Sequence, residues 1–176
     1  MDEKNLINYL GKLAKNNPSA LQLNDDIFFD KKKEIAISVD TYNEGTHFPK
    51  SPKLGLLIKK IIRSSISDLI CKGVKPKYYF ISFTCPKKYL NKSKILKLIN
   101  SLKDEQKKYK IKLSGGDSTN GNFLSFTIIS LGYSSKIIKR NNVKFNDDIY
   151  ISGNIGDSYL GLKSVSYTHL TLPTTD

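Results

Sequence analysis

Residues 113–119 have the sequence Leu-Ser-Gly-Gly-Asp-Ser-Thr and lie between two stretches that alternate apolar and polar side chains, 109–114 and 123–133. Paired glycines adopt backbone angles that are closed to other residues and let a ligand approach the chain closely. Asp117 follows them, and a carboxylate at such a turn is a hard oxygen ligand suited to Mg²⁺. Because Gly-Gly-Asp is also common in ordinary turns, the segment by itself predicts two strands joined at a turn.

Periodic patterns predict the other elements of the chain. Alternating apolar residues predict strands at residues 27–29, 34–40, 78–84 and 148–152. Apolar residues at helical spacing predict helices at residues 3–13 and 93–109, and a third helix that is capped by Ser51, has Pro52 at its first position and ends at Gly73. Helices that alternate with strands favour an α+β domain with helices packed on one mixed sheet.

The charge of the chain is strongly positive. Its 176 residues, 39% of them hydrophobic, are enough to bury the core of one domain, and the formal net charge is +13. Such a charge is typical of proteins that bind nucleic acids. However, of the 29 cationic residues only Arg63 and Arg140 are arginines, and specific readers of phosphates and bases favour arginine. The charge therefore indicates a lysine-rich composition, with no nucleic-acid partner.

The two cysteines fit no metal-binding spacing. Cys71 comes late in a helical pattern and Cys85 ends a strand-like run, so we expect two buried thiols. We find no signal peptide and no apolar run long enough to cross a membrane. The chain is therefore expected to be cytoplasmic and to have no membrane partner.

Three further acidic positions share the setting of Asp117. The pair Asp25-Asp26 precedes a strand, Asp40 ends one, and Asp68 lies on a helix beside two serines at the margin of an apolar face. No Walker lysine loop, Ser-His-Asp order or Cys/His cluster competes with them. Carboxylates without imidazole or thiolate suit Mg²⁺, which most often serves a nucleotide phosphate. The pattern predicts a Mg·ATP site, and separate capping of turns and helices by each aspartate stays open as the alternative.

Six short segments follow one another from about residue 24 to residue 162: Asn24–Asp26, Ile37–Thr41, Glu44–Phe48, Ser67–Leu69 with Gly73 and Pro76, Gly115–Thr119, and Gly153–Ser158 with Gly161 and Leu162. In order and spacing they resemble the motifs of the thiamine-monophosphate kinase family. That family belongs to the superfamily that also contains aminoimidazole-ribonucleotide synthetase and selenophosphate synthetase. The Gly-x-His-Phe pattern at residues 45–48 favours the thiamine branch over its relatives.

The resemblance implies a fold, a reaction and a set of site residues. The fold is a ferredoxin-like ATP-binding domain of the α+β class, with a mixed, mainly antiparallel sheet and helices packed on one face. The reaction is the phosphorylation of thiamine monophosphate to thiamine diphosphate, with ATP as co-substrate and no catalytic residue assigned beyond the metal cluster. The matching positions imply Mg²⁺ ligation by Asp26, Ser38, Asp40, Asp68 and Asp117. They imply ATP contacts from Gly116, Asp117 and Arg140, and a contact to the thiamine phosphate from His47. Domains of this superfamily pair with their sheets joined, so a homodimer is also implied.

The chain departs from the family pattern in three places. Asn24 replaces a glycine, and Val39 replaces a threonine and so removes a hydroxyl near the metals. After residue 162 the family carries a second domain with further metal and substrate residues. We therefore expect residues 1–162 to be the amino-terminal ATP-binding domain and the carboxy-terminal domain to be absent, and the activity of this chain alone stays open. Residues 163–176 are excluded from the domain, because from Ser164 onward the chain has no lysine and resembles translated vector read-through.

Three alternative functions remain open at this point. The chain could belong to another enzyme of the superfamily, such as one that resembles aminoimidazole-ribonucleotide synthetase, which substrate choice with ATP would reveal. It could be a non-catalytic fragment that binds nucleotide or dimerises without turnover. It could also be a basic nucleic-acid binder, which a salt-insensitive lack of affinity for DNA and RNA would exclude.

Overall fold

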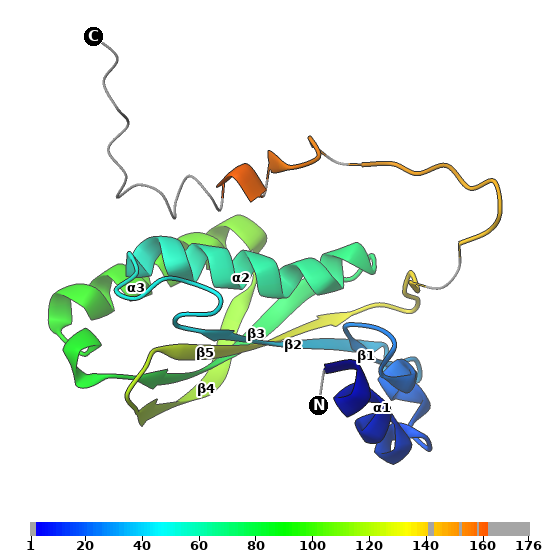
Figure 1. Ribbon diagram of the computed structural model, residues 1–176, viewed down its shortest axis with the longest axis horizontal. Helices are drawn as coiled ribbons and strands as arrows, with labels where there is room; N and C mark the ends of the chain where they lie inside the picture. Colours follow the sequence, from blue (N-terminus) through cyan, green and yellow to red (C-terminus); the bar gives the residue numbers. More distant parts are fainter. Residues whose placement is uncertain (1–2, 141–142, 152, 158, 162–176) are drawn as a thin grey trace, which may run out of the picture. The chain divides into compact units, whose positions relative to one another are not determined.

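The computed structural model describes residues 3–140, 143–151, 153–157 and 159–161. The chain divides into two compact units, Met1–Asn142 and Val143–Asp176, and the description below concerns the first. In this unit two long helices, α2 (Leu54–Cys71) and α3 (Lys92–Tyr109), cover one face of a five-stranded sheet (Figure 1). The α+β fold with helices on one face of the sheet is therefore confirmed.

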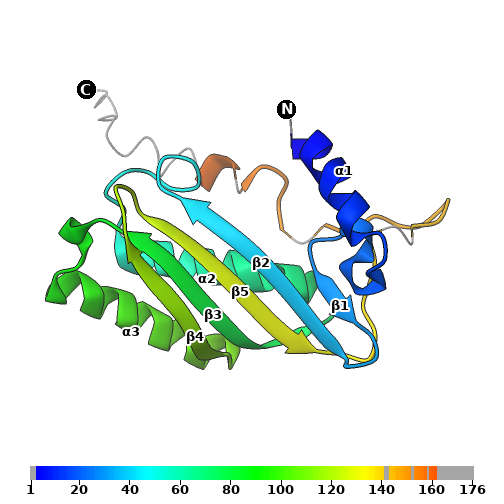
Figure 2. The same ribbon diagram turned by 90° about the horizontal axis from the view of Figure 1, so that it is seen from below.

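The sheet is mixed, as expected. Its strand order is β1-β2-β5-β3-β4, in which β3 and β4 pair in parallel and all other neighbours pair antiparallel (Figure 2). The strands are β1 (Phe28–Asp30), β2 (Ile35–Asn43), β3 (Lys75–Cys85), β4 (Lys112–Asn120) and β5 (Ser125–Tyr133). The remaining elements are helix α1 (Glu3–Ala14) and the 3₁₀ segments η1 (Pro18–Leu23) and η2 (Lys87–Tyr89).

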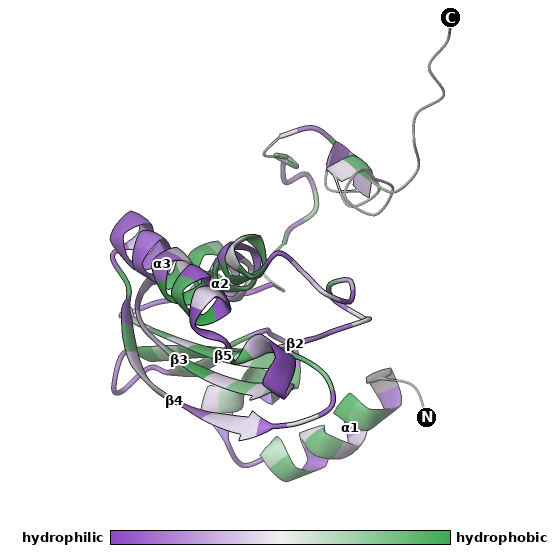
Figure 3. Cartoon of the chain, turned by 90° about the vertical axis from the view of Figure 1, so that its left-hand side faces the viewer, coloured by the Kyte–Doolittle hydropathy of each residue, from purple (hydrophilic) through white to green (hydrophobic). Residues whose placement is uncertain are grey.

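Alternation along the strands gives the sheet a helix-covered face and an open face. On β2, Ser38 and Tyr42 are buried under the helices, whereas Val39 and Thr41 are exposed. The main core lies between the covered face and the two helices, and its fully buried members include Ile58, Ile61, Ile62 and Ile128. Helix α3 carries long hydrophilic stretches, as a helix with one face in water should (Figure 3). No helix within the described residues is long and apolar enough to cross a membrane.

The Gly-Gly-Asp segment lies inside a strand, so the turn predicted there is wrong. Strand β4 continues from Lys112 to Asn120, because residues 115–120 pair in register with residues 80–85 of β3. A Cβ atom on Gly116 would lie 1.8 Å from the carbonyl oxygen of Ile81. The glycine therefore allows close approach of two strands, and it does not form a turn.

Three smaller predictions are also corrected. Ser51 does not cap α2, which begins at Leu54; its backbone N–H instead donates to Oε1 of Glu44 over 3.2 Å. Residues 148–151 form no strand, and residue 152 of that prediction lies outside the described residues. Cys71 is exposed on the last turn of α2, whereas Cys85 is buried as expected.

Candidate metal and nucleotide site

Asp40 and Asp68 meet where α2 crosses β2 on the covered face of the sheet. Ser38 and Asp40 are two residues apart on β2, so the strand period points both side chains toward the helices. The hydroxyl of Ser38 donates to Oδ2 of Asp68 over 2.9 Å, which links the strand to the helix. The hydroxyl of Tyr42 donates to Oδ2 of Asp40 over 3.1 Å. The alternation of β2 and the apolar face of α2 thus bring Ser38 and Asp40 to Asp68, which follows Asp40 by 28 residues along the chain.

Burial and neighbouring carboxylates disfavour the ionised form of Asp40 and Asp68. Burial raises the pKa of both Asp40 and Asp68 above the ordinary value of an aspartate. Repulsion from Asp26 raises the pKa of both further, and Asp40 also acts on Asp68. The hydroxyls of Tyr42 and Ser38 lower each pKa in turn without reversing its shift. Binding of a cation would relieve this repulsion.

The donor set fits Mg²⁺ held together with a substrate. Carboxylate and hydroxyl oxygens are hard ligands. Within the described residues, however, no three His, Cys, Asp or Glu side chains are grouped so that they alone could hold an ion. Mg²⁺ usually keeps several waters and is held by one or two carboxylates plus substrate phosphates, so an open carboxylate group suits it better than a closed cage. Metal ligation by Asp26, Ser38, Asp40 and Asp68 remains a prediction.

Arg140 lies beside this acidic group. Its Nη2 pairs with Oδ2 of Asp26, and the two side chains are 61% and 47% exposed. Exposed surface ion pairs are weak, so an incoming phosphate can compete for the guanidinium. The predicted contact between Arg140 and ATP is therefore compatible with its position.

Asp117 and Gly116 lie apart from the other predicted ligands. Asp117 pairs with Ser82, and two residues further along both strands Thr84 Oγ1 and Thr119 Oγ1 lie 3.2 Å apart. These side chains share the open face, whereas Asp40 lies on the covered face. Strands β5 and β3 also separate β4 from β2. One copy of the chain thus brings together Asp26, Asp40 and Asp68, but not Asp117.

His47 sits on a loop that is fixed by polar contacts. Its Nδ1 accepts the backbone N–H of Asn43 over 3.0 Å, and its carbonyl oxygen accepts Nζ of Lys60 over 2.7 Å. In the neutral imidazole this leaves the proton on Nε2, which can donate to a ligand. Glu44 anchors the same loop, since its carboxylate accepts the N–H of Leu124 over 3.0 Å. The predicted contact of His47 with a phosphate fits this tautomer.

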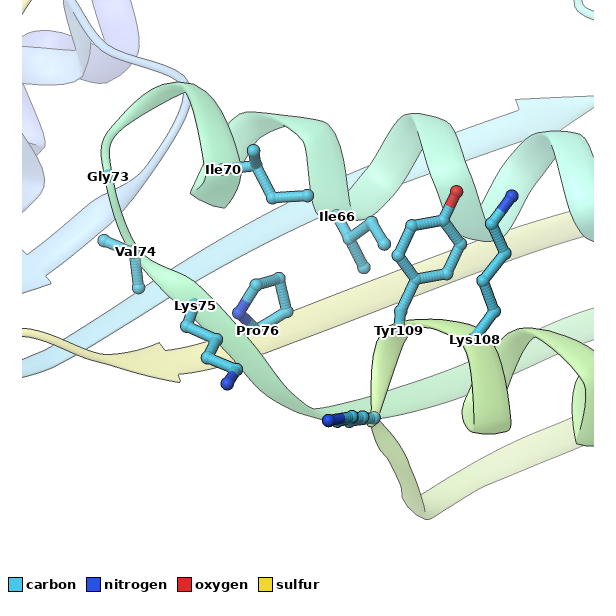
Figure 4. A pocket seen from close by; sticks show the side chains of 9 residues that line it. Ile66, Ile70, Gly73, Val74, Lys75, Pro76, Lys108 and Tyr109 are labelled. Atoms are coloured by element: carbon cyan, nitrogen blue, oxygen red, sulfur yellow. The ribbon is translucent and has the colours of Figure 1, made fainter.

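The described residues line two cavities, of which one adjoins the acidic group. One, of about 510 Å³, is lined by Asn24, Asp25, Lys139 and Arg140 together with residues near η1. The other, of about 500 Å³, lies between the ends of α2 and α3, where Ile66, Ile70 and Tyr109 surround it (Figure 4). The first cavity adjoins the predicted site, and the second is on the α3 side of α2.

Sequence reasoning missed Lys72, Lys60 and Tyr42. Lys72 forms a buried ion pair with Asp25, Lys60 holds the His47 loop, and Tyr42 binds Asp40. The period of β2 could have indicated Tyr42, because it shares a face with Ser38 and Asp40. The two lysines carry no local signal in a chain where lysine is so frequent.

The fold and the site together define an α+β domain whose carboxylates, beside an exposed arginine, suit a metal-bound polyanion. The family described as AIR synthase related protein, N-terminal domain, matches residues 20–133. The chain belongs to this family. The resemblance seen in the six sequence segments is thereby confirmed.

Curated relatives are thiamine-monophosphate kinases. The chain is 29% identical over 168 residues to that of Nitrosopumilus maritimus (strain SCM1), which covers 95% of this chain and 52% of the relative. It is 33% identical over 150 residues to that of Haemophilus influenzae, which covers 82% of this chain and 45% of the relative. The chain spans about half the length of the curated relatives it matches.

Solved structures of the same kind match the fold. Thiamine monophosphate kinase from Aquifex aeolicus matches 94% of this chain and 55% of its own chain, with a TM-score of 0.79 at 25% identity. A structure of AaThiL complexed with AMPPCP and TMP matches 93% of this chain and 52% of its own, with a TM-score of 0.82 at 25% identity. The mixed sheet with helices on one face is thus the fold of the matched half of these proteins.

Proposed function

We propose that this chain is the ATP-binding half of a cytoplasmic thiamine-monophosphate kinase. The observation that carries the proposal is the bond between Ser38 of β2 and Asp68 of α2 on the face that carries Asp40, together with the neighbouring pair of Asp26 and Arg140. Such a group suits a nucleotide with its metal ion. The relatives support the choice of reaction, since they are named for it and one solved structure holds AMPPCP and TMP.

The acceptor in this reaction is a phosphate. Its attacking oxygen is already anionic, so no strong general base is needed. The bond between the γ-phosphorus of ATP and the oxygen that stays on ADP breaks, and a bond to an oxygen of thiamine monophosphate forms, giving ADP and thiamine diphosphate. The main barrier is therefore the approach of two polyanions and their in-line placement.

The chain would supply charge cancellation on the donor side. Asp26, Ser38, Asp40 and Asp68 would hold Mg²⁺, which would supply positive charge to neutralise the phosphates. Arg140 would leave its exposed pair with Asp26 to bind a phosphate of ATP. The fixed position of these groups before binding is the contribution of the fold.

On the acceptor side His47 would position the thiamine phosphate. The bond from Asn43 to its Nδ1 keeps the Nε2 proton available. The Glu44 contacts to Leu124, Ser51 and Tyr89 hold the loop in place. A donor on a fixed loop loses little freedom when it binds its ligand.

A second copy of the chain would cover the open face of the sheet. Val39 is 59% exposed and Tyr133 is 49% exposed on this face, and the partly buried Ile37, Ile129 and Leu131 alternate in the same direction. Apolar side chains gathered on one open face are typical of an interface. Asp117 lies on this face and Gly116 precedes it in β4, so their predicted contacts with ATP would be made at or beside the junction of two copies.

The test is calorimetric titration of Mg·ATP into the chain, with EDTA as the control. Binding that requires Mg²⁺ is expected, and turnover with thiamine monophosphate would then be measured after adding the carboxy-terminal half of a relative. If a folded chain, checked by circular dichroism, binds no nucleotide, the proposal fails for this half alone. Light scattering on the same sample reports whether the chain dimerises.

A further inference from the structure

Lys72 is buried although it is a lysine at the end of a helix. It follows Cys71, the last residue of α2, and is only 7% exposed. Its Nζ pairs with Oδ1 of Asp25, whose side chain is also 7% exposed. Two charges removed from water in this way are unfavourable unless they are held in one geometry, so the pair fixes the positions of both segments.

Lys72 contacts two further segments that carry predicted site residues. Its carbonyl oxygen accepts the backbone N–H of Ile138 over 3.0 Å, two residues before Arg140. Its side chain reaches Asp25, which is next to Asp26. One turn earlier on the same helix lies Asp68. The end of α2 is therefore the place where the chain segments of Asp26, Asp68 and Arg140 converge.

The Asp25 carboxylate links these segments more closely. It accepts the backbone N–H of Asp26 over 3.3 Å, and the backbone of Arg140 lies close enough to help lower the pKa of Asp25. The side chains of Asp26 and Arg140 pair with each other in turn. Fixing Asp25 thus fixes the backbone on both sides of the Asp26–Arg140 pair.

The ion pair is not needed to pack this end of the molecule. A small apolar cluster already joins the end of α2 to β1 and β2, through Ile27, Phe29, Ala36, Leu69 and Val74. Buried ion pairs can often be replaced by apolar residues of similar volume without loss of stability, so such a pair is a weak source of stability. What it adds here is a defined direction for the backbone at Asp25 and for the segment that leads to Arg140.

We propose that Lys72 is a positioning residue of the nucleotide site: its buried ammonium holds Asp25, and through Asp25 it holds Asp26 and Arg140 where they meet the phosphates. This inference rests on the proposed function. Lys72 would then also fix one side of the neighbouring 510 Å³ cavity, because Asp25 and Arg140 line that cavity. Lys72 does not touch the nucleotide and acts only through Asp25 and the 138–140 segment.

The experiment compares the parent chain with Lys72→Met and with the double variant Lys72→Met/Asp25→Leu. The double variant replaces both charges with apolar side chains, so it should keep the unfolding temperature of the parent within a few degrees even if the single variant is unstable. The control is Lys59→Met, which makes the same change on the same helix but breaks an exposed pair with Asp104. Backbone hydrogen exchange and Mg·ATP affinity are measured for every chain.

In the double variant we expect exchange at residues 24–26 and 137–140 to be at least about tenfold faster than in the parent, and Mg·ATP affinity to fall by about tenfold. The Lys59→Met control should match the parent in both. Unchanged exchange in both segments overturns the inference, and so does unchanged affinity when the parent binds. A folded parent that binds no Mg·ATP overturns the proposed function instead, and the exchange rates then decide alone whether Lys72 fixes the two segments.

Discussion

Asp40 and Asp117 lie at nearly the same level along the strands of one sheet, but their side chains lie on opposite faces of it. Asp40 pairs with Ile128 of β5, which pairs with Ile81 of β3, which pairs with Gly116. Asp40 is half-buried on the covered face, whereas Asp117 is exposed on the open face about 14 Å away across three strand spacings. Packing within one chain assembles the first region, whereas in the proposed dimer a second copy would complete the second.

The surroundings of an acidic residue on a strand depend on whether a helix covers the face of the sheet that carries it. On β2 the helix crossing brings a second carboxylate and a hydroxyl to Asp40, so charge accumulates. On β4 no helix within the described residues covers Asp117, and the role of the glycine before it is to let the strand approach β3. The predictions below separate these two regions, beginning with the largest effect.

Gly116→Ala should disrupt β4. The added Cβ would overlap the carbonyl oxygen of Ile81, so the strand must move away from β3 or detach. We expect a loss of about 3 kcal/mol in the free energy of unfolding, measured by urea denaturation. Gly11→Ala is the matched control, because nothing lies within 4 Å of its Cβ position on α1. Gly11→Ala should raise the free energy of unfolding by up to about 1 kcal/mol. Equal effects of the two substitutions would show that β4 does not approach Ile81 closely at Gly116.

Asp68→Asn and Asp117→Asn should separate the two acidic regions. Asp68→Asn relieves repulsion from Asp40 and Asp26, so the metal-free chain should unfold at a higher temperature, while Mg·ATP affinity falls by about 100-fold. Asp117→Asn should leave the stability of the metal-free chain within about 0.5 kcal/mol of the parent, because the residue is exposed.

The Mg·ATP affinity of Asp117→Asn tests whether this carboxylate acts from a second copy of the chain. If a second copy supplies this carboxylate, its loss should weaken Mg·ATP binding only at protein concentrations where the chain is dimeric. Calorimetry at two concentrations, with light scattering on each, measures this. A concentration-independent loss would mean that Asp117 acts within one chain, against the separation seen in the sheet. Asp104→Asn, on the exposed side of α3, is the charge control.

The contrast between Asp40 and Asp117 also shows how far the sequence alone could go. The period of β2 and of α2 correctly predicted a strand, a helix and the face that carries Asp68. The same reasoning ended a strand at Gly115, because paired glycines favour turns and the pairing with β3 that overrides this preference is non-local. For the same reason no local pattern could assign Asp117 to the open face, or join Lys72 to Asp25 across 47 residues.

His47→Asn tests the binding of the phosphate acceptor, thiamine monophosphate, and its expected effect is smaller. Asparagine can keep an acceptor for the N–H of Asn43, but it loses the donor at Nε2. Affinity for thiamine monophosphate should fall by about tenfold, with Mg·ATP affinity unchanged, as measured by calorimetry in the chain joined to the carboxy-terminal half of a relative. His47→Gln, which can restore a donor near Nε2, should recover part of the loss. A fall in Mg·ATP affinity would instead assign His47 to the nucleotide side.

The smallest effect concerns pH, and it reports on the covered region alone. The pKa values of Asp40 and Asp68 are raised by burial and by neighbouring carboxylates, so the folded chain binds more protons than the unfolded chain above the ordinary aspartate value. Its free energy of unfolding must therefore rise as the pH falls through the raised values. The pKa values of Asp25 and Glu44 are lowered, so their stabilisation is lost only below the ordinary carboxylate range, outside this window.

In EDTA the unfolding temperature of the parent should therefore rise as the pH falls from neutrality toward the ordinary aspartate value. Asp68→Asn should flatten this slope, because it removes one of the two raised groups and part of the repulsion on the other. An equal slope in the parent and in Asp68→Asn would mean that Asp40 and Asp68 do not share an acidic site on the covered face, and the contrast between the two faces would then have no electrostatic basis.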